Sequence, residues 1–349
     1  MMKNTANINE FERIYSSLFS IVILVILISF ISSPELSISA ISTNFRWRSN
    51  LINIYTSFRF KIGDRIYNNA VVGKDGWFFY TGEESIMDYQ NTAPLSKVKL
   101  SNFQKRLDQI SASLEERGSM LLVVVPPNKS TIYSQNMPAE IPVLGTESRL
   151  DQFVEYMRMN GNTPVVDLRQ TLLNVSRSKD VYFKTDTHWN SMGAYYGYVE
   201  ILNILSSNYP TLTPRSLSDF EYKNSGFSTR DISNIIGLPN YKEETWSLVP
   251  KFEVQLAETK VPAPDGIRYI RTVTNKNENL PQLLIYGDSF YGALAQFLEP
   301  HFGRVKFIPF TNDSKIWSLD WIQQEEPDIV IIEIVERYLD TGLLMLLDN

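Results

Sequence analysis

The chain contains two histidines, and one of them lies in a stretch whose residue types suit acid–base chemistry. His188 follows Asp186 by two positions in Asp-Thr-His-Trp, and Ser289 lies further along the chain in Gly-Asp-Ser-Phe. An imidazole titrates near neutral pH and can take the proton of a serine hydroxyl, while a carboxylate beside it fixes the tautomer. These three residues are therefore the parts of a nucleophilic triad.

Both motifs also have a purely structural explanation. Gly-Asp-Ser after a strand is ordinary turn chemistry, and a polar stretch before a helix can be an N-cap. Asn190 or Ser191 can cap that helix instead, which leaves Asp186 and His188 free for other work. The second histidine, His301, follows a helix end with no acid placed to orient it, so we expect it at the surface. We expect no metal site, because two isolated histidines without clustered carboxylates provide too few ligands.

The composition is compatible with a globular catalytic domain, and the charge argues against nucleic acid as a partner. The 349 residues are 43% hydrophobic and 12% aromatic, enough to bury one large core or two modest ones. A net charge of -6 provides no basic field for phosphates. Because the chain has no cysteine, thiol nucleophiles, disulfides and thiolate metal sites are excluded. We expect no cofactor.

The N-terminus predicts a membrane anchor. No residue between Arg13 and Glu35 is charged, and this length suffices for a helix to cross roughly 30 Å of hydrocarbon. The alternative is a cleaved signal peptide with Ser37-Ile38-Ser39 as its cleavage site. The anchor is favoured because the segment before it is long and contains Glu10 and Glu12. The predicted segments are a tail (1–16), a signal anchor (17–34), a stalk (35–70) and a catalytic domain (71–349).

Short apolar runs alternate with helical patterns through the catalytic domain, which predicts an α/β fold with a parallel sheet covered on both faces. The expected strands are 121–125, 164–168, 283–286, 305–308 and 329–335. The expected helices run from Ser101 as N-cap to just before Gly118, over 192–205, and over 291–299. Residues 206–281 are polar, and we expect an insertion of loops and short hairpins there. Ser289 follows a strand, where ligands bind in such sheets.

Five motifs in this order resemble those of the SGNH-hydrolase-like O-acetyltransferases of bacterial exopolysaccharide assembly, typified by the alginate acetylation proteins AlgJ and AlgX. The motifs are Gly73-Lys74-Asp75-Gly76-Trp77-Phe78-Phe79, Val125-Pro126-Pro127-Asn128-Lys129, Asp186-Thr187-His188-Trp189-Asn190, Gly287-Asp288-Ser289-Phe290 and Glu333-Ile334-Val335-Glu336-Arg337. The resemblance covers about residues 71–340. It implies a three-layer, flavodoxin-like sheet in circularly permuted order, because ordinary SGNH hydrolases begin with their Gly-Asp-Ser strand. It also implies that Ser289 is the nucleophile, His188 the base and Asp186 its orienting group.

The chain departs from the family pattern at the oxyanion hole. SGNH hydrolases carry a Gly-x-Asn-Asp loop after the strand that corresponds to residues 327–332, and this chain has Val335-Glu336-Arg337-Tyr338 there. Arg337 is our expected substitute donor. A backbone amide at the start of the helix after Ser289 is the alternative. An ion pair of Arg337 with Glu333 or Glu336 would be the structural explanation for this arginine.

Two more residues are candidates for contacts with the substrate or the oxyanion. Tyr291 begins the helix that follows Ser289. Lys129 lies in a loop at the exit of a strand, where it could contact the substrate or could be a solvated turn residue.

The resemblance implies an enzyme that acetylates hydroxyls of a secreted or cell-surface polysaccharide through an acetyl-serine intermediate. It implies that a membrane-bound O-acyltransferase supplies the acetyl group. The single-pass anchor would hold the catalytic domain outside the cytoplasmic membrane, in the periplasm or the extracellular space. A carbohydrate acetylesterase with the same triad and a non-catalytic glycan-binding scaffold are the alternatives. The first two differ only in whether water is kept from the intermediate.

Overall fold

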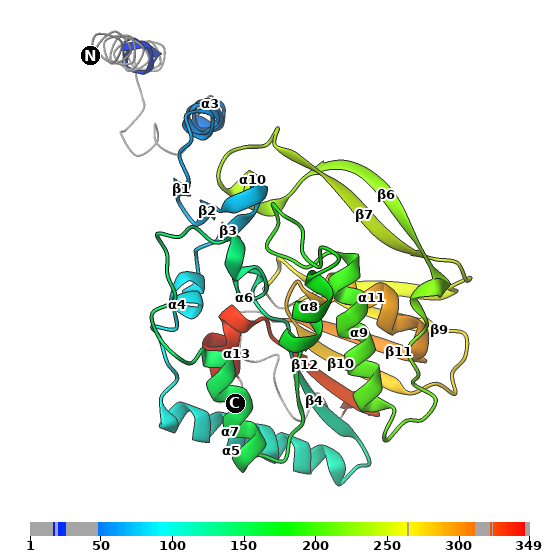
Figure 1. The fold of residues 1–349 in the computed structure, drawn as a ribbon. Helices are drawn as coiled ribbons and strands as arrows, with labels where there is room; N and C mark the ends of the chain where they lie inside the picture. The colour runs from blue at the N-terminus through cyan, green and yellow to red at the C-terminus, as the bar shows by residue number, and fades with distance from the viewer. Residues whose placement is uncertain are drawn as a thin grey trace, which may run out of the picture. The chain divides into compact units, whose positions relative to one another are not determined.

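The computed structural model describes residues 17, 20–25, 48–263, 265–310, 322 and 324–345 (Figure 1). The chain forms two compact units, residues 1–55 and 56–349. Of the predicted anchor, only residues 17 and 20–25 are described, and they are helical. Among the described residues, no helix has both the length and the hydropathy that crossing a bilayer requires. The predicted tail and residues 35–47 of the predicted stalk lie outside the described residues.

A small antiparallel sheet and a helix open the larger unit. They are α3 (Arg48–Lys61), which begins in the first unit, and the strands β1 (Ile66–Tyr67), β2 (Ala70–Val72) and β3 (Phe78–Tyr80). Tyr67, Ala70 and Phe78 pack with Ile232 of α10 (Asp231–Ile235) in one apolar cluster. Tyr67 and Ala70, at the end of the segment assigned to the stalk, are therefore core residues of this small sheet.

A seven-stranded sheet forms the centre of the larger unit, in the order β5-β4-β12-β10-β11-β9-β8 (Figure 1). Its strands are β4 (Met120–Val125), β5 (Val165–Asp167), β8 (Leu256–Pro262), β9 (Tyr269–Asn275), β10 (Gln282–Gly287), β11 (Arg304–Pro309) and β12 (Ile329–Glu333). All five strands predicted from the sequence are present, and they pair in parallel. β12 ends two residues earlier than predicted.

The segment 206–281 contributes more to the fold than the predicted loops and short hairpins. Strands β8 and β9 extend the sheet at one edge in antiparallel fashion, so this edge differs from the predicted parallel sheet. A second, longer hairpin of β6 (Phe220–Thr229) and β7 (Lys242–Pro250) forms a separate ribbon. An edge hairpin with an exposed face carries residues such as Glu258 and Lys260, so it lacks the continuous apolar run of a buried parallel strand.

Helices cover both faces of the central sheet and give three layers. One face packs on α8 (Arg169–Ser176), α9 (Ser191–Leu205) and α11 (Tyr291–Leu298), and the other on α5 (Lys97–Glu115), α7 (Arg149–Asn160) and α13 (Leu339–Met345). Successive strand residues point to opposite faces. In β4, Leu122 therefore joins the first of these cores, whereas Leu121 and Val123 join the second. This double burial is the reason for the uninterrupted apolar run of that strand.

Helix caps follow the prediction at α9 and correct it at α5. Asn190, one of two predicted caps, accepts hydrogen bonds from the first amides of α9. Helix α5 begins earlier than predicted. Its N-cap is Ser96, whose side chain accepts a hydrogen bond from the Lys99 amide, and not the predicted Ser101. The added turn buries Leu100 in line with the predicted apolar stripe of the helix.

His301 is half-buried against α9, so it is less exposed than the surface location that the sequence predicted. Its Nε2 lies 2.8 Å from the Tyr198 hydroxyl, which also accepts the Arg215 amide at 2.7 Å. The Tyr198 proton is thus directed to a neutral imidazole. Burial, helped by the positive charge of Arg215, lowers the pKa of His301 to about 4. The sequence pattern could not show this contact, because Tyr198 and His301 meet only through tertiary packing.

This environment predicts a loss of stability in acid that depends on His301. The folded-state pKa lies below the unfolded value of 6.5, so the contribution is present above pH 6.5 and is lost as the pH falls toward 4. Between about pH 7 and pH 5, the wild type should lose about 2 kcal/mol more unfolding free energy than His301→Gln, which does not titrate. Urea unfolding at both pH values measures this difference. Equal losses in the two proteins would contradict the burial of a neutral imidazole.

Candidate active site

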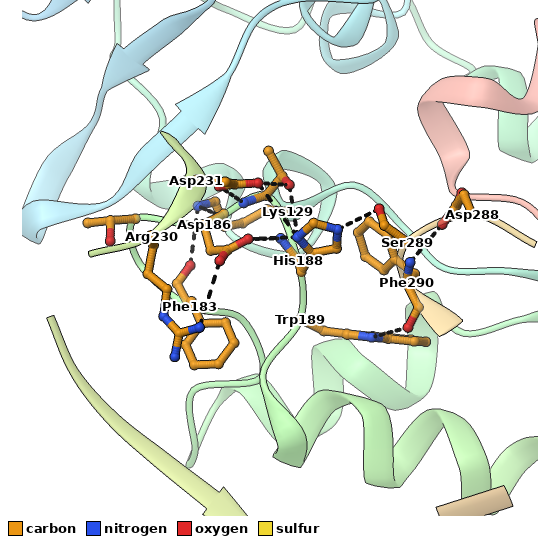
Figure 2. Close-up of polar contacts among 12 residues, drawn as sticks. Lys129, Phe183, Asp186, His188, Trp189, Arg230, Asp231, Asp288, Ser289 and Phe290 are labelled. Atoms are coloured by element: carbon orange, nitrogen blue, oxygen red, sulfur yellow. Dashed lines mark hydrogen bonds and ion pairs between the residues drawn. The ribbon is translucent and has the colours of Figure 1, made fainter. Parts of the chain in front are cut away.

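Three residues predicted from the sequence meet at the carboxyl edge of the parallel strands (Figure 2). Ser289 follows β10, and His188 lies in the loop that precedes α9. His188 Nε2 is 2.6 Å from Ser289 Oγ, and His188 Nδ1 is 2.7 Å from Asp186 Oδ1. This is the geometry of a serine hydroxyl, a base and a carboxylate that orients the base.

The loop from Val181 to Asn190 holds Asp186 and His188 in this arrangement. Asp186 Oδ1 accepts both the ring N–H and, at 3.0 Å, the backbone amide of His188. Burial alone would raise the pKa of Asp186, but its hydrogen bond to His188 and the charge of that imidazole lower the pKa to about 2. Asp186 is therefore an ionised acceptor at neutral pH. A bridge between Tyr182 and Trp189 closes the loop at its base.

Lys129 supports this loop from the interior. It begins α6 (Lys129–Ile132), is buried, and donates from Nζ to the carbonyls of Phe183, Lys184 and Asp186 at 3.2, 3.0 and 2.5 Å. Burial lowers the pKa of Lys129 to about 8, although the nearby carboxylates oppose the shift. The ammonium of Lys129 is bound to three carbonyls of the loop. Its surroundings are therefore neither those of the predicted substrate contact nor those of a solvated turn residue.

A second carboxylate, which the sequence did not single out, lies beside the imidazole. Asp231 begins α10, and its Oδ2 is 3.6 Å from His188 Nδ1. Its Oδ1 accepts the Thr187 amide at 2.8 Å, and its Oδ2 accepts the Thr187 hydroxyl. In the sequence, Asp231 is an acidic residue at a helix start inside the segment 206–281, which is where helix-dipole effects alone would place one.

This cluster contradicts the expectation that no carboxylates gather around a histidine. Atoms of Asp186, His188 and Asp231 that could bind a metal ion lie within 4.8 Å of one another, so carboxylates do cluster at a histidine. In the structure these atoms are engaged in hydrogen bonds with the loop and with Ser289. The arrangement fits a base with two neighbouring carboxylates.

The loop that carries Ser289 is tied to the loop after β12. Asp288 accepts the Phe290 amide through Oδ1 and the Val335 amide through Oδ2, both at 2.8 Å. Glu333, at the end of β12, accepts the Asp288 amide at 3.0 Å, and burial raises the pKa of Glu333 well above its usual value. These bonds fix the turn that presents the Ser289 hydroxyl.

Arg337 and Ser289 line one cavity of about 1190 Å³. The guanidinium lies over the Phe290 ring at 5.6 Å, and its Nε pairs with Glu83 at 3.5 Å. The two acids proposed as structural partners are engaged elsewhere: Glu333 accepts the Asp288 amide, and Glu336 accepts from the Asn128 amide and the Thr131 hydroxyl. In the described residues, the ion-pair partner of Arg337 is therefore Glu83, and not Glu333 or Glu336 as the alternative proposed.

Tyr291 also borders this cavity, but its hydroxyl is bound to Glu299 and not to Ser289 or His188. It donates to Glu299 Oε1 at 2.8 Å, and its ring stacks on Phe307 with centroids 4.5 Å apart. The side chain of Tyr291 thus belongs to the packing of α11.

The β8–β9 hairpin, the turn after β3 and the start of α7 line further parts of the cavity, together with residues of α11, β11 and α13. Their charged residues form ion pairs with one another: Glu84 with Arg149, and Glu258 with Lys260 and Arg271. The cavity is therefore polar and large, but much of its charge is already balanced.

The fold has three layers, and its Gly-Asp-Ser and Asp-x-His motifs meet at the carboxyl edge of the parallel strands. This combination defines an SGNH-hydrolase-like enzyme. A family model described as "SGNH hydrolase-like domain, acetyltransferase AlgX" matches residues 70–304. The chain belongs to this AlgJ/AlgX-like family and is an O-acetyltransferase.

Individual proteins are similar to this chain in sequence or in fold. The chain is 23% identical to the probable alginate O-acetylase AlgJ of Pseudomonas putida, over 82% of this chain and 74% of that protein. Its fold is similar to a DHHW family protein from Eubacterium siraeum, with a TM-score of 0.58 and 15% identity over 80% of this chain and 97% of that one. It is also similar to PatB1 of Bacillus cereus, with a TM-score of 0.55 and 16% identity over 76% and 96%.

Proposed function

We propose that the protein acetylates hydroxyls of a secreted or cell-surface polysaccharide through an acetyl group carried on Ser289. The observation that carries the proposal is the 2.6 Å contact between His188 Nε2 and Ser289 Oγ, with the other ring nitrogen bound to Asp186. The polysaccharide as acceptor is supported by the alginate O-acetylase relatives.

In the first half-reaction, Ser289 Oγ attacks the carbonyl carbon of an acetyl donor while His188 Nε2 takes its proton. The donor's leaving group departs with that proton, and an acetyl ester remains on Ser289. In the second half-reaction a sugar hydroxyl attacks this ester, again with His188 as base. The acetylated sugar leaves, and the proton that His188 took from the sugar hydroxyl passes to Ser289 Oγ. Asp186 holds the Nδ1 proton and stabilises the imidazolium in both steps.

We propose two donors for the negative oxygen that develops in each step, the Ser289 amide and Arg337. The Ser289 amide has no acceptor within the described part of the chain. Arg337 carries a positive charge in the same cavity, and its buried Nε, 3.5 Å from Glu83, makes no hydrogen bond within the residues that the structure describes. A donor that is already in place when the charge forms lowers the barrier most effectively.

A carbohydrate acetylesterase is the second candidate, and one observation favours it. The Ser289 side chain is exposed in a wide cavity, so water can reach an acetyl group held there. Transfer then depends on the acceptor sugar displacing water from the cavity.

The donor is proposed to come from a membrane-bound O-acyltransferase. Residues 17–34 would anchor the catalytic domain at the outer face of the cytoplasmic membrane, next to that partner. Support for this arrangement is the uncharged run in the sequence.

The test is acetyl partitioning in the full-length protein. With p-nitrophenyl acetate as donor and uronic acid or neutral oligosaccharides as acceptors, mass spectrometry should find more acetylated oligosaccharide than free acetate. A chelator should leave the rate unchanged, since the proposed steps use no metal. Free acetate in excess would favour the esterase, and no acetyl group on Ser289 would favour a non-catalytic scaffold.

A further inference from the structure

The imidazole of His188 faces two carboxylates rather than one. Figure 2 shows Asp186 and Asp231 both on the side of the ring away from Ser289. Asp186 Oδ1 is 2.7 Å from Nδ1, and Asp231 Oδ2 is 3.6 Å from the same nitrogen. The proposed mechanism uses only the first of them.

Thr187 connects Asp231 to the imidazole. Both oxygens of Asp231 accept hydrogen bonds from this one residue, through its amide and its hydroxyl. The hydroxyl oxygen of Thr187 lies 3.2 Å from His188 Nδ1. Because the hydroxyl proton is directed to Asp231, a lone pair of that oxygen faces the ring nitrogen. The proton on Nδ1 is therefore surrounded by acceptors, which leaves the Nε2 lone pair for Ser289.

The charges around the ring come from several elements of the fold. They are Asp186 of the loop, Arg230 and Asp231 at the start of α10, Lys129 of α6, Glu243 of β7, and, on the nucleophile side, Asp288 and Arg337. Lys129 is bound to backbone carbonyls, and Arg230 lies 3.7 Å above the Phe183 ring. Asp231 is the carboxylate beyond Asp186 that approaches Nδ1 within 4 Å in the described residues.

We propose that Asp231 is a second positioning residue of His188, which holds the Thr187 hydroxyl as an acceptor toward Nδ1 and adds negative charge beside the imidazolium. The inference rests on the proposed function, because it concerns the same base. A single carboxylate already suffices to orient a catalytic histidine. The added role of Asp231 is to prevent the Thr187 hydroxyl from donating to Nδ1 and stabilising the wrong tautomer.

Glu243 provides a matched control. Its Oε2 accepts the Thr185 amide at 2.9 Å, so it holds the same loop through a partly buried carboxylate. Its charged neighbours in the described residues are Lys129 and Arg230, the latter at 3.8 Å, and no contact joins it to the imidazole of His188. A defect caused only by a looser loop should appear in Glu243→Gln as well as in Asp231→Asn.

The first experiment measures the rate of Ser289 acetylation by p-nitrophenyl acetate against pH in the full-length protein. Asp231→Asn should slow acetylation about tenfold and should move the acid limb of the profile down by about one pH unit, because a neighbouring negative charge is lost. Glu243→Gln should lower the rate without moving the limb. An unmoved limb in Asp231→Asn, or an equal movement in both variants, would overturn the inference.

The second experiment keeps the inference testable if no acetylation of Ser289 occurs, which would end the proposed function by itself. With two histidines in the chain, the ring proton signals are readily assigned by NMR using His301→Gln. The titration midpoint of His188 should lie lower in Asp231→Asn than in the wild type and should be unchanged in Glu243→Gln. Coincident midpoints in Asp231→Asn and wild type would overturn the inference independently of catalysis.

Discussion

Replacing Ser289 with alanine is expected to abolish covalent acetylation of the protein by p-nitrophenyl acetate. The hydroxyl of Ser289 lies 2.6 Å from His188 Nε2, so its proton can pass directly to that imidazole. Removal of a triad nucleophile lowers turnover by a factor on the order of 10⁶. Mass spectrometry of the intact protein and of its peptides measures the acetyl group and its position.

Two further variants make this result specific. His188→Ala should reduce acetylation nearly as much, and the double variant should be no worse than either single one, because residues that act as a unit are not additive. Ser247→Ala serves as the control, since Ser247 lies on the exposed β6–β7 ribbon and hydrogen-bonds to Ser225. It should be acetylated like the wild type. Equal acetylation of Ser289→Ala and wild type would show that another residue is the nucleophile.

The fold could be predicted where burial leaves a pattern in the sequence. Strands β4, β10 and β12 are covered on both faces, so their residues form continuous apolar runs. The sequence predicted short hairpins in the segment 206–281, but not that the β8–β9 hairpin extends the central sheet, because its exposed edge residues are polar and its place in the sheet comes from pairing with β11. Long-range pairing of this kind has no local signature in one sequence.

The residues of the candidate site could be predicted where they stand in short sequence motifs, and could not be predicted where tertiary packing determines the contacts. Ser289, His188 and Asp186 stand in short motifs, and the structure brings them into contact. The environment of Lys129 depends on a loop that folds over its side chain. The environment of Asp231 depends on the start of α10 packing against Thr187. Their residue types are common at turns and helix ends, so nothing local distinguishes them.

Trp189 lies between the two loops of the candidate site. Of the variants proposed here, Trp189→Ala is expected to lose the most unfolding free energy. The side chain is 1% exposed, and its Nε1 donates to the Phe290 carbonyl at 3.0 Å. It thus connects the loop of His188 to the loop of Ser289. Trp189→Ala should lower the free energy of unfolding by about 3–5 kcal/mol, because a large cavity forms and a buried carbonyl loses its donor. Urea unfolding followed by circular dichroism measures the loss.

Matched variants separate packing from the hydrogen bond. Trp246, which is 37% exposed on the β6–β7 ribbon and stacks on Tyr222, is the control, and Trp246→Ala should cost about 1 kcal/mol or less. Trp189→Phe keeps much of the packing but lacks the donor, so about 1–2 kcal/mol should be lost. Its acetylation rate should fall further than this stability loss explains, because the two loops are no longer tied at Phe290. If Trp189→Ala is no less stable than Trp246→Ala, the loops are held together by other contacts.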